Sequence, residues 1–485
     1  MVTGLQRSAA RIVPVLMLTL AACTESHRSS AAATPGKATS TAVPCPSATA
    51  PSPTTSPTAA PALGAVTPTV NAAALAHHGR LAFVSQGRLW VLDGDHAALR
   101  GLPTVTGRVP QDPSFSADGM WLSFLEATPI PDPEARSSGS LWMARADGSS
   151  PHEVTALSDV QAVGWSPGSD VFAALTGPAS SGIPCGGPTA VQLISPDGFV
   201  RPLMNAGSIA GAAWSPDGTQ MAVSIEDADR PGRTTLETYR LSGGSPSVWL
   251  SSSSPANVGI MQPAAWWPIW NIGFWVFGGG MVHNNDQTPL DIVASPGGRP
   301  ERLGDTLSDG TTVAFAAASN GFLAIVNASA VSDAGRVYWQ GKQVEVCEPA
   351  SRICTPVPTP TGTVTVDPSW APGGTTLAFV RAPERTRSSF EQSAVAGWYG
   401  AHQLWLYGLA DRSLHEVGAA VGATAPTWSS DGKSLLYVAD DGLWLLTSLT
   451  APPVEVAKPL FPADAWPSYY GQVDWSGQFA WSSVP

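Results

Sequence analysis

Short apolar segments alternate with turn sequences along most of the chain. A segment ending in an aromatic residue is followed by a turn such as Trp214-Ser-Pro-Asp-Gly218, and then by a second apolar segment, here Met221–Ile225. Pro fixes φ, Asp bonds its own backbone and Gly takes a positive φ, so this sequence predicts a tight turn between two β-strands. The apolar positions show no helical period, which favours an all-β protein.

This turn recurs along the chain. Its successive copies are anchored at residues 115, 165, 214, 266, 317, 370, 428 and 475, about 50 residues apart, and those at 266 and 317 are degraded. A third apolar strand, such as Leu89–Gly94, and a fourth, more polar one, such as His152–Leu157, follow the turn. Four antiparallel strands per repeat predict a β-propeller blade. Eight third strands predict eight blades, and seven blades are the alternative.

The two ends of the repeat region predict how the ring closes. The chain enters the first blade at a second strand, Leu81–Ser85, and its last motif lies at Val473–Ser476. We expect Val473–Ser476 to complete the first blade as its innermost strand, because closure removes free sheet edges. The propeller is therefore expected to occupy residues 71–485.

The tandem Trp-Ser-Pro-Asp-Gly turns resemble those of the TolB-like, WD-repeat-like β-propeller family, over about residues 75–485. The resemblance implies a propeller that docks partners in the cell envelope. Some actinobacterial lipoproteins with such propellers assist membrane sensor kinases, and the Ala/Gly/Pro-rich composition fits a high-GC organism.

The N-terminal sequence predicts a targeting segment. Arg7 and Arg11 precede the apolar stretch Ile12–Leu20, and Leu20-Ala-Ala-Cys23 resembles a bacterial lipobox. We expect residues 1–22 to be a signal peptide and Cys23 to carry a lipid such as palmitate; an ordinary secretory signal is the alternative. Residues 23–70, rich in Ser, Thr, Ala and Pro, are expected to form a disordered tether. The protein would then be extracytoplasmic, held at the cell membrane by its lipid anchor only.

The charge argues against one class of partner, and the cysteine content suggests disulfides. The net charge is −12 and only 13% of the residues are charged, which argues against a nucleic-acid partner. In an oxidising compartment we expect a disulfide between Cys347 and Cys354, which flank a strand-turn-strand sequence. Cys45 and Cys185 could join the tether to the propeller, and free or intermolecular thiols are the alternative.

One motif suggests catalysis but has a structural interpretation. Gly164–Gly168 fits G-x-S-x-G, the nucleophile elbow of hydrolases, yet that elbow needs a helix after the serine, and a strand follows here. Ser166 occupies the turn position held elsewhere by Ser116, Ser215 and Ser429. The acidic residues of these turns, Asp118, Asp217 and Asp431, recur in the same way. We therefore predict no catalytic residue, no metal site and no cofactor.

Function is expected on the variable loops, which include Glu126–Gly139. The longest loop holds a candidate binding set rich in Arg and aromatic residues: Arg381, Arg385, Arg387, Phe390, Trp398 and Tyr399. A second candidate is an aromatic ligand platform of Trp266, Trp267, Trp270 and Trp275, for which the core of a degraded blade is the alternative. We predict a monomeric envelope lipoprotein whose propeller binds another, unidentified envelope protein. A small-molecule or glycan binder is the second hypothesis, and a propeller hydrolase or lyase the third.

Overall fold

The computed structural model describes most of the expected propeller region. The described residues are 67–128, 138–177, 188–227, 233–251, 261–267, 271–276, 287–307, 315–328, 342–384, 398–460, 475 and 477–483. All described residues belong to one compact unit, Pro57–Pro485. The expected signal peptide, Cys23, Cys45 and Cys185 lie outside the described residues. No helix among the described residues is long and apolar enough to cross a membrane.

The described residues form eight antiparallel sheets, seven of four strands and one of five, which we number as blades in chain order. Blade 1 contains β2 (Arg80–Ser85), β3 (Arg88–Asp93), β4 (Ala98–Gly101) and β33 (Phe479–Ser482). Blade 2 contains β5 (Val109–Phe115), β6 (Trp121–Ala127), β7 (Gly139–Arg145) and β8 (His152–Glu153). Blade 3 contains β9 (Gln161–Trp165), β10 (Phe172–Thr176), β11 (Ala190–Ile194) and β12 (Val200–Asn205). Blade 4 contains β13 (Ser208–Trp214), β14 (Gln220–Glu226), β15 (Thr234–Arg240) and β16 (Ser247–Ser251).

The second half of the ring repeats this arrangement. Blade 5 contains β17 (Met261–Trp267), β18 (Asn271–Val276), β19 (Gln287–Val293) and β20 (Glu301–Leu307). Blade 6 contains β21 (Phe315–Ala317), β22 (Leu323–Ala328), β23 (Lys342–Cys347) and β24 (Cys354–Pro356). Blade 7 contains β25 (Thr363–Trp370), β26 (Thr376–Pro383), β27 (Gln403–Gly408) and β28 (Leu414–Val421). Blade 8 contains β29 (Thr424–Trp428), β30 (Leu435–Ala439), β31 (Gly442–Leu446), β32 (Val454–Lys458) and the added β1 (Thr69–Val70). A short helix, α1 (Ala72–Leu75), precedes blade 1.

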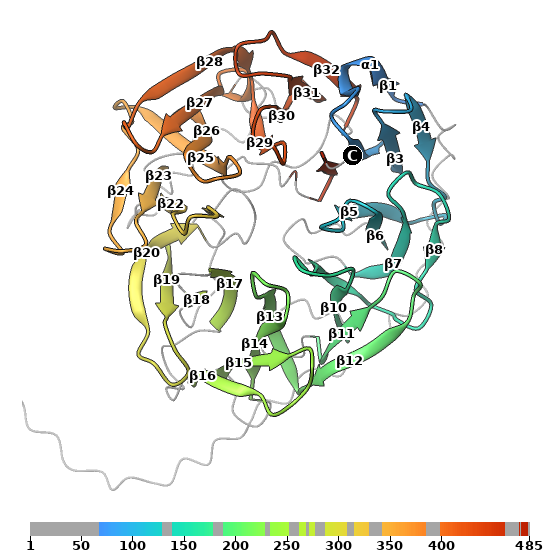
Figure 1. Cartoon of the computed structure of the whole chain (residues 1–485), viewed down its shortest axis with the longest axis vertical. Coiled ribbons are helices and arrows are strands. Elements are labelled where there is room, and N and C mark those ends of the chain that lie inside the picture. Colours follow the sequence, from blue (N-terminus) through green and yellow to red (C-terminus); the bar gives the residue numbers. More distant parts are fainter. Residues whose placement is uncertain are drawn as a thin grey trace, which may run out of the picture. The chain divides into compact units, whose positions relative to one another are not determined.

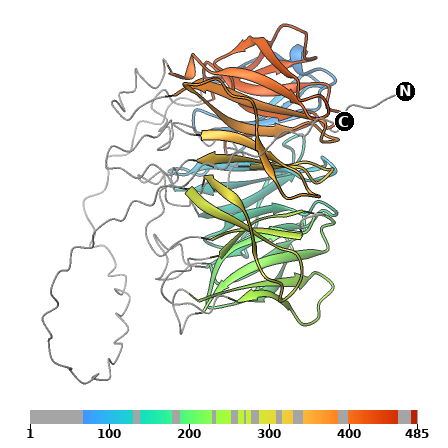
Figure 2. The same ribbon diagram turned by 90° about the vertical axis from the view of Figure 1, so that its left-hand side faces the viewer.

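The hydrophobic core lies between the blades and joins each blade to the next. One buried cluster combines Leu92 of blade 1 with Leu445 of blade 8, and similar clusters connect blades 1 and 2, 2 and 3, 3 and 4, 4 and 5, 5 to 7, and 7 and 8. Figure 1 shows the sheets around a closed ring, and Figure 2 shows from the side that they form a single layer of blades. The expected β-propeller is confirmed.

Indole groups tie the innermost strands together. The Trp that ends the first strand of a blade donates its Nε1–H to a carbonyl oxygen on the first strand of the preceding blade. Among the residues that the structure describes, the bonds of this kind are Trp165 to Ser114 at 3.0 Å, Trp214 to Gly164 at 3.0 Å, Trp370 to Ala316 at 3.2 Å and Trp428 to Ser369 at 3.0 Å. Each acceptor carbonyl belongs to the residue directly before the last residue of its own first strand. The last residue of a first strand therefore donates the indole N–H in one blade, and the residue before it accepts in the preceding blade.

The closing strand differs from the expected one. We expected Val473–Ser476, whereas the strand that pairs with β2 is β33, Phe479–Ser482. Trp481 lies opposite Leu81, just as Trp214 lies opposite Met221 in blade 4. The prediction of Val473–Ser476 was wrong because the sequence contains two Trp-Ser pairs near its end, and only the second reaches this register.

The start of the propeller also lies earlier than expected. Thr69 and Val70, assigned from sequence to the tether, form β1 and pair with Lys458 and Ala457 of β32. β1 thus lies on the outer edge of blade 8, before the chain enters blade 1.

Candidate functional site

The Ser-x-Asp-Gly turns are built from hydrogen bonds within the turn. In blade 4, Ser215 Oγ donates to Asp217 Oδ1 at 2.6 Å and accepts the backbone N–H of Gln220 at 2.9 Å. Asp217 Oδ1 also accepts the N–H of Thr219 at 3.0 Å. The Ser215 hydrogen bond, the largest cause, holds the pKa of Asp217 below its usual range. Since the same bonds occur around Asp118 and Asp431, the prediction that these aspartates serve the turns is confirmed.

Ser166 is fully buried and serves a contact between blades. Its Oγ donates to the carbonyl oxygen of Gly218 in the next blade at 3.4 Å and accepts the N–H of Gly168 at 3.3 Å. Similarly, Asn320 Nδ2 of blade 6 donates to the Gly374 carbonyl of blade 7 at 3.0 Å. These side chains join successive turns, so the interpretation of Ser166 as a turn residue is confirmed.

The two ends of each blade therefore differ. Turns between first and second strands and between third and fourth strands lie at one end, because neighbouring strands are antiparallel. The segments between second and third strands leave from the opposite end, for example between β6 and β7 and between β26 and β27. Two variable loops noted in the sequence, Glu126–Gly139 and the Arg-rich loop that follows Arg381, are connections of this second type. We call this end of a blade the loop end.

Arg381, the first residue of the predicted binding set, is buried at the loop end of blade 7. It belongs to β26 and is only 8% exposed. Its guanidinium carbon lies 3.8 Å from the centre of the Trp405 ring, and Nη2 donates to the carbonyl of Pro358 at 3.0 Å. Burial lowers the pKa of Arg381, and the charge of Glu416 acts in the opposite direction. These contacts give Arg381 a packing role at the loop end of blade 7.

Trp398 is likewise a packed residue, 4% exposed. Its indole donates to the carbonyl of Pro383 at 2.8 Å, and its ring lies edge-on to His402 at 4.1 Å. Tyr399 packs against His402 at 5.1 Å and is half-buried. Burial lowers the pKa of His402 to about 3, with a backbone hydrogen bond to Ala423 opposing it, so this histidine is neutral at physiological pH.

The predicted binding set therefore divides. Arg381 and Trp398 were expected on a docking surface, and their burial removes them from it. Arg385, Arg387 and Phe390 lie outside the described residues.

The tryptophan platform is described only in part. Trp266 and Trp267 belong to β17 and Trp275 to β18, whereas Trp270 lies outside the described residues. Trp266 is half-buried and packs edge-on against Trp249 of blade 4, with 6.1 Å between the ring centres. This contact agrees with the alternative interpretation of Trp266 as core of a degraded blade.

Cys347 and Cys354 lie opposite each other in the β23–β24 pair, and the structure joins their sulfur atoms at 2.00 Å. The two cysteines are thus close enough for the disulfide that the strand-turn-strand sequence predicts.

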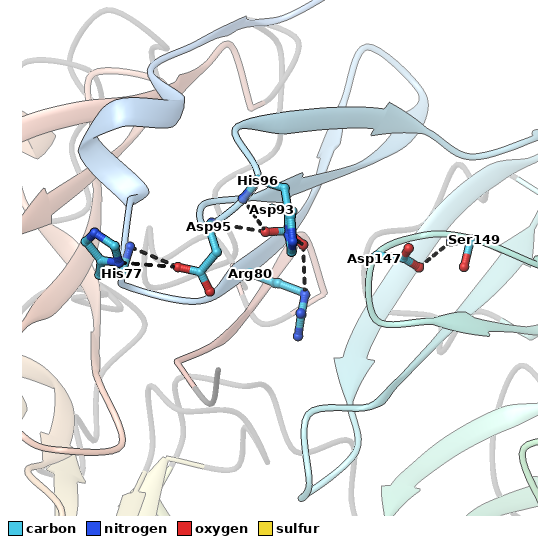
Figure 3. Close-up of polar contacts among 7 residues, drawn as sticks. All are labelled: His77, Arg80, Asp93, Asp95, His96, Asp147 and Ser149. Carbon is cyan, nitrogen blue, oxygen red and sulfur yellow. Dashed lines mark hydrogen bonds and ion pairs between the residues drawn. The ribbon is translucent and has the colours of Figure 1, made fainter.

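A polar cluster gathers around the turn after β3 in blade 1 (Figure 3). Asp93 Oδ2 lies 3.1 Å from Arg80 Nε and 3.1 Å from His96 Nδ1, while Oδ1 accepts the N–H groups of Asp95 and His96. Asp95 in turn accepts the backbone N–H of His77 at 3.1 Å. Burial alone would raise the pKa of Asp93, but the hydrogen bonds from His96 and Arg80 hold it below its usual range.

This cluster resembles an acid–base or metal site in composition but is built as a turn. Asp147 and Ser149, also drawn in Figure 3, form a separate pair with the same turn bond, at 2.9 Å. Among the residues that the structure describes, no group of three or more His, Cys, Asp or Glu side chains is arranged to hold a metal ion. The hydrogen bonds of Asp93 instead hold the backbone of the turn after β3 in place.

Glu126 is the most unusual carboxyl group, and sequence reasoning assigned it only to the start of a loop. It lies near the end of β6 at the loop end of blade 2, and it is fully buried. Burial raises its pKa to about 7, although the Val105 backbone and the charge of Arg108 lower it; Glu153 adds a smaller rise. Arg108 Nη1 donates to the Glu126 backbone carbonyl at 3.1 Å and to Ser140 Oγ at 2.8 Å.

Comparisons with known proteins show no match to a family model and no match to a curated protein. Several solved structures resemble the chain. One is a prolyl endopeptidase from a study of two such enzymes and their inter-domain dynamics, with 13% identity and a TM-score of 0.46 over 73% of this chain and 50% of that one. Another is an oligogalacturonate lyase in complex with manganese, with 11% identity and a TM-score of 0.41 over 81% and 97%.

A third is the β-propeller domain of the Trilobed protease from Pyrococcus furiosus, with 8% identity and a TM-score of 0.40 over 74% of this chain and 99% of that one. The chain thus spans half the length of the prolyl endopeptidase that it matches. Similarity this low carries no argument about activity, and the propeller assignment rests on the sheets, the shared cores and the indole bonds.

A pattern in the sequence could have found Glu126. The penultimate or last position of three second strands is polar and buried, at Ser85, Glu126 and Glu226. A polar residue that breaks an apolar strand at nearly the same place in several repeats indicates a shared structural position.

Proposed function

We propose that the chain is a cell-envelope lipoprotein, anchored through Cys23, that presents a TolB-like propeller as a binding scaffold for another envelope protein. Two sequence features support the proposal: the lipobox Leu20–Cys23 and the Ser/Thr/Ala/Pro-rich stretch that follows it. The proposed role is one of binding rather than catalysis.

The observation that carries the proposal is that structural turns occupy one end of the blades, whereas the variable loops leave from the other end. Serine and aspartate side chains of the described turns bind their own backbone or the neighbouring blade, as Ser166 and Asp217 do. The segments between second and third strands, which vary most in sequence, leave from the opposite end. A rigid ring with variable loops at one end is typical of a docking scaffold.

The structure sharpens the test of this proposal. Residues 385–397 can be replaced by a Gly/Ser linker of equal length, which leaves the buried Arg381 and Trp398 in place. Tagged protein would be crosslinked in intact cells, and proteins recovered with it identified by mass spectrometry. A secreted Cys23→Ala form reports whether capture needs the anchor, and an equal-length replacement of residues 329–341 is the matched loop control.

We expect one envelope protein to be captured by the wild type and by the 329–341 control, and lost with the 385–397 replacement. If both replacements capture the same protein as the wild type, docking does not use the blade 7 loop. If no form captures a protein, the scaffold proposal is wrong, and tryptophan fluorescence against cell-wall fragments would test the small-molecule or glycan hypothesis.

A further inference from the structure

Residues 69–79, which comprise β1, α1 and the four residues after the helix, lie across the seam between blade 8 and blade 1. We call this segment the strap. In Figure 1 it occupies the region where the last and first blades meet. Its first residues contact blade 8, its last residues contact blade 1, and Leu75 and His78 contact both.

Blade 8 holds the first half of the strap. Val70 of β1 pairs with Ala457, and the N–H of Asn71 donates to the carbonyl of Val456 at 2.8 Å. Asn71 Oδ1 also accepts the N–H of Ala74 at 3.2 Å and so caps α1. These bonds add β1 to the sheet of blade 8 as an outer fifth strand. The helix α1 begins directly after β1.

Leu75 marks the crossing point. It is fully buried in a cluster that contains Leu92 of blade 1 together with Leu445 and Val456 of blade 8. One side chain of the strap therefore fills the space between the two blades, and its removal would leave a cavity in the seam itself.

Blade 1 holds the second half of the strap. Asp95 accepts the N–H of His77 at 3.1 Å, and the N–H of Gly94 donates to the carbonyl of Gly79 at 3.0 Å. The carbonyl of His78 accepts the indole N–H of Trp481 on the closing strand β33 at 2.7 Å. The polar cluster of Figure 3 thus fixes the turn that receives the strap.

His78 contacts both sides of the seam. While its carbonyl binds Trp481 of blade 1, its ring Nδ1 lies 3.3 Å from Ser434 Oγ of blade 8. The fit against blade 1 is close: a Cβ on Gly94 would lie 2.2 Å from the carbonyl oxygen of Leu75.

We infer that the strap is an external clasp of the ring: β33 closes the seam from the innermost edge of blade 1, and residues 69–79 close it from outside. Releasing the strap opens the seam between blades 8 and 1 while the other blades stay folded. This inference concerns the ring itself and does not depend on the proposed function.

The test uses two variants in the secreted Cys23→Ala form of the full chain. Gly94→Ala places a methyl group against the Leu75 carbonyl and pushes the strap away, and Leu75→Ala removes the side chain that bridges the blades. Gly418→Ala is the control for the first variant, because its Cβ would meet no atom within 4 Å. Ala73→Ser, on the exposed side of α1, is the control for the second.

Native-state hydrogen exchange, read by mass spectrometry, distinguishes a clasp from general stabilisation. We expect both variants to exchange at least tenfold faster than the wild type in β2, β30, β31 and β33, with β13–β15 of blade 4 and both controls unchanged. Equal acceleration in all blades, or unchanged exchange at the seam, would overturn the inference. If Gly94→Ala yields no folded protein, Leu75→Ala decides alone, because it removes atoms and introduces no collision.

Discussion

Replacing Glu126 by glutamine should change how the stability of the protein depends on pH. Glu126 is fully buried, and burial raises its pKa from 4.5 to about 7. The charged groups that act on it are Arg108, which lowers the pKa, and Glu153, which raises it slightly. Between these two pH values the folded state holds a proton that the unfolded state has released, so the free energy of unfolding falls as the pH rises from about 4.5 to about 7.

The size of the effect follows from the shift. One pKa unit corresponds to about 1.4 kcal/mol, so a rise from 4.5 to about 7 gives an upper bound of about 3 kcal/mol. Glutamine has nearly the same shape and never ionises. Glu126→Gln should therefore match the wild type near pH 4.5 and exceed its free energy of unfolding at pH 8, by up to about 3 kcal/mol.

Guanidinium unfolding of the secreted Cys23→Ala form, followed by tryptophan fluorescence between pH 4.5 and 8.5, measures this difference. Ser140→Ala is the control: it removes one partner of Arg108 but keeps the carboxyl group, so its pH dependence should follow the wild type. Stability curves for the wild type and Glu126→Gln that run parallel from pH 4.5 to 8.5 would refute the reasoning.

Three further predictions follow from particular bonds. Trp428→Phe removes the indole donor to the Ser369 carbonyl and should lower the free energy of unfolding by about 1 kcal/mol. Guanidinium titration measures this change, and an unchanged midpoint would contradict a stabilising role for the indole bond. Asp431→Asn should destabilise the protein above pH 4 but not below pH 2. The Ser429 hydrogen bond lowers the pKa of Asp431 from 3.8 to about 2, so its contribution to stability is lost as the pH falls through 2. Acid titration followed by circular dichroism should show the two stability curves converging, and a constant difference between wild type and variant would contradict the prediction. Cys354→Ser should lower the free energy of unfolding by about 2.5 kcal/mol on the chain-entropy model, measured by guanidinium titration. If a thiol reagent labels Cys347 in the unreduced wild type, the disulfide is not formed.

The repeat could be predicted because its turn chemistry is local. Pro, Asp and Gly at fixed positions specify a turn wherever they occur, and Ser215 and Asp217 make the bonds that this chemistry requires. The apolar strands beside the turns then have few alternatives to a four-stranded blade. The fold class, the third strands and the structural role of Ser166 followed from such local patterns.

The closing strand could not be assigned with the same method. Trp475-Ser476 and Trp481-Ser482 both match the end of a first strand, and the sequence between them does not distinguish the two. The choice depends on which tryptophan can lie opposite Leu81 and reach the carbonyl of His78, both more than 390 residues away along the chain. A contact of that kind is a property of the closed ring.

The predicted binding loop shows a second limit of composition. Arg and aromatic residues are enriched at interfaces because they combine large apolar surfaces with hydrogen-bond donors, and the same properties suit them to the interior of a loop base. Arg381 stacks on Trp405 and donates to Pro358, while Trp398 donates to Pro383. The sequence could place these residues at the correct end of blade 7, but it could not show that Arg381 and Trp398 are buried. The separation matters for experiment, since a deletion that included Trp398 would remove part of the core and would lose a partner whether or not the loop binds one.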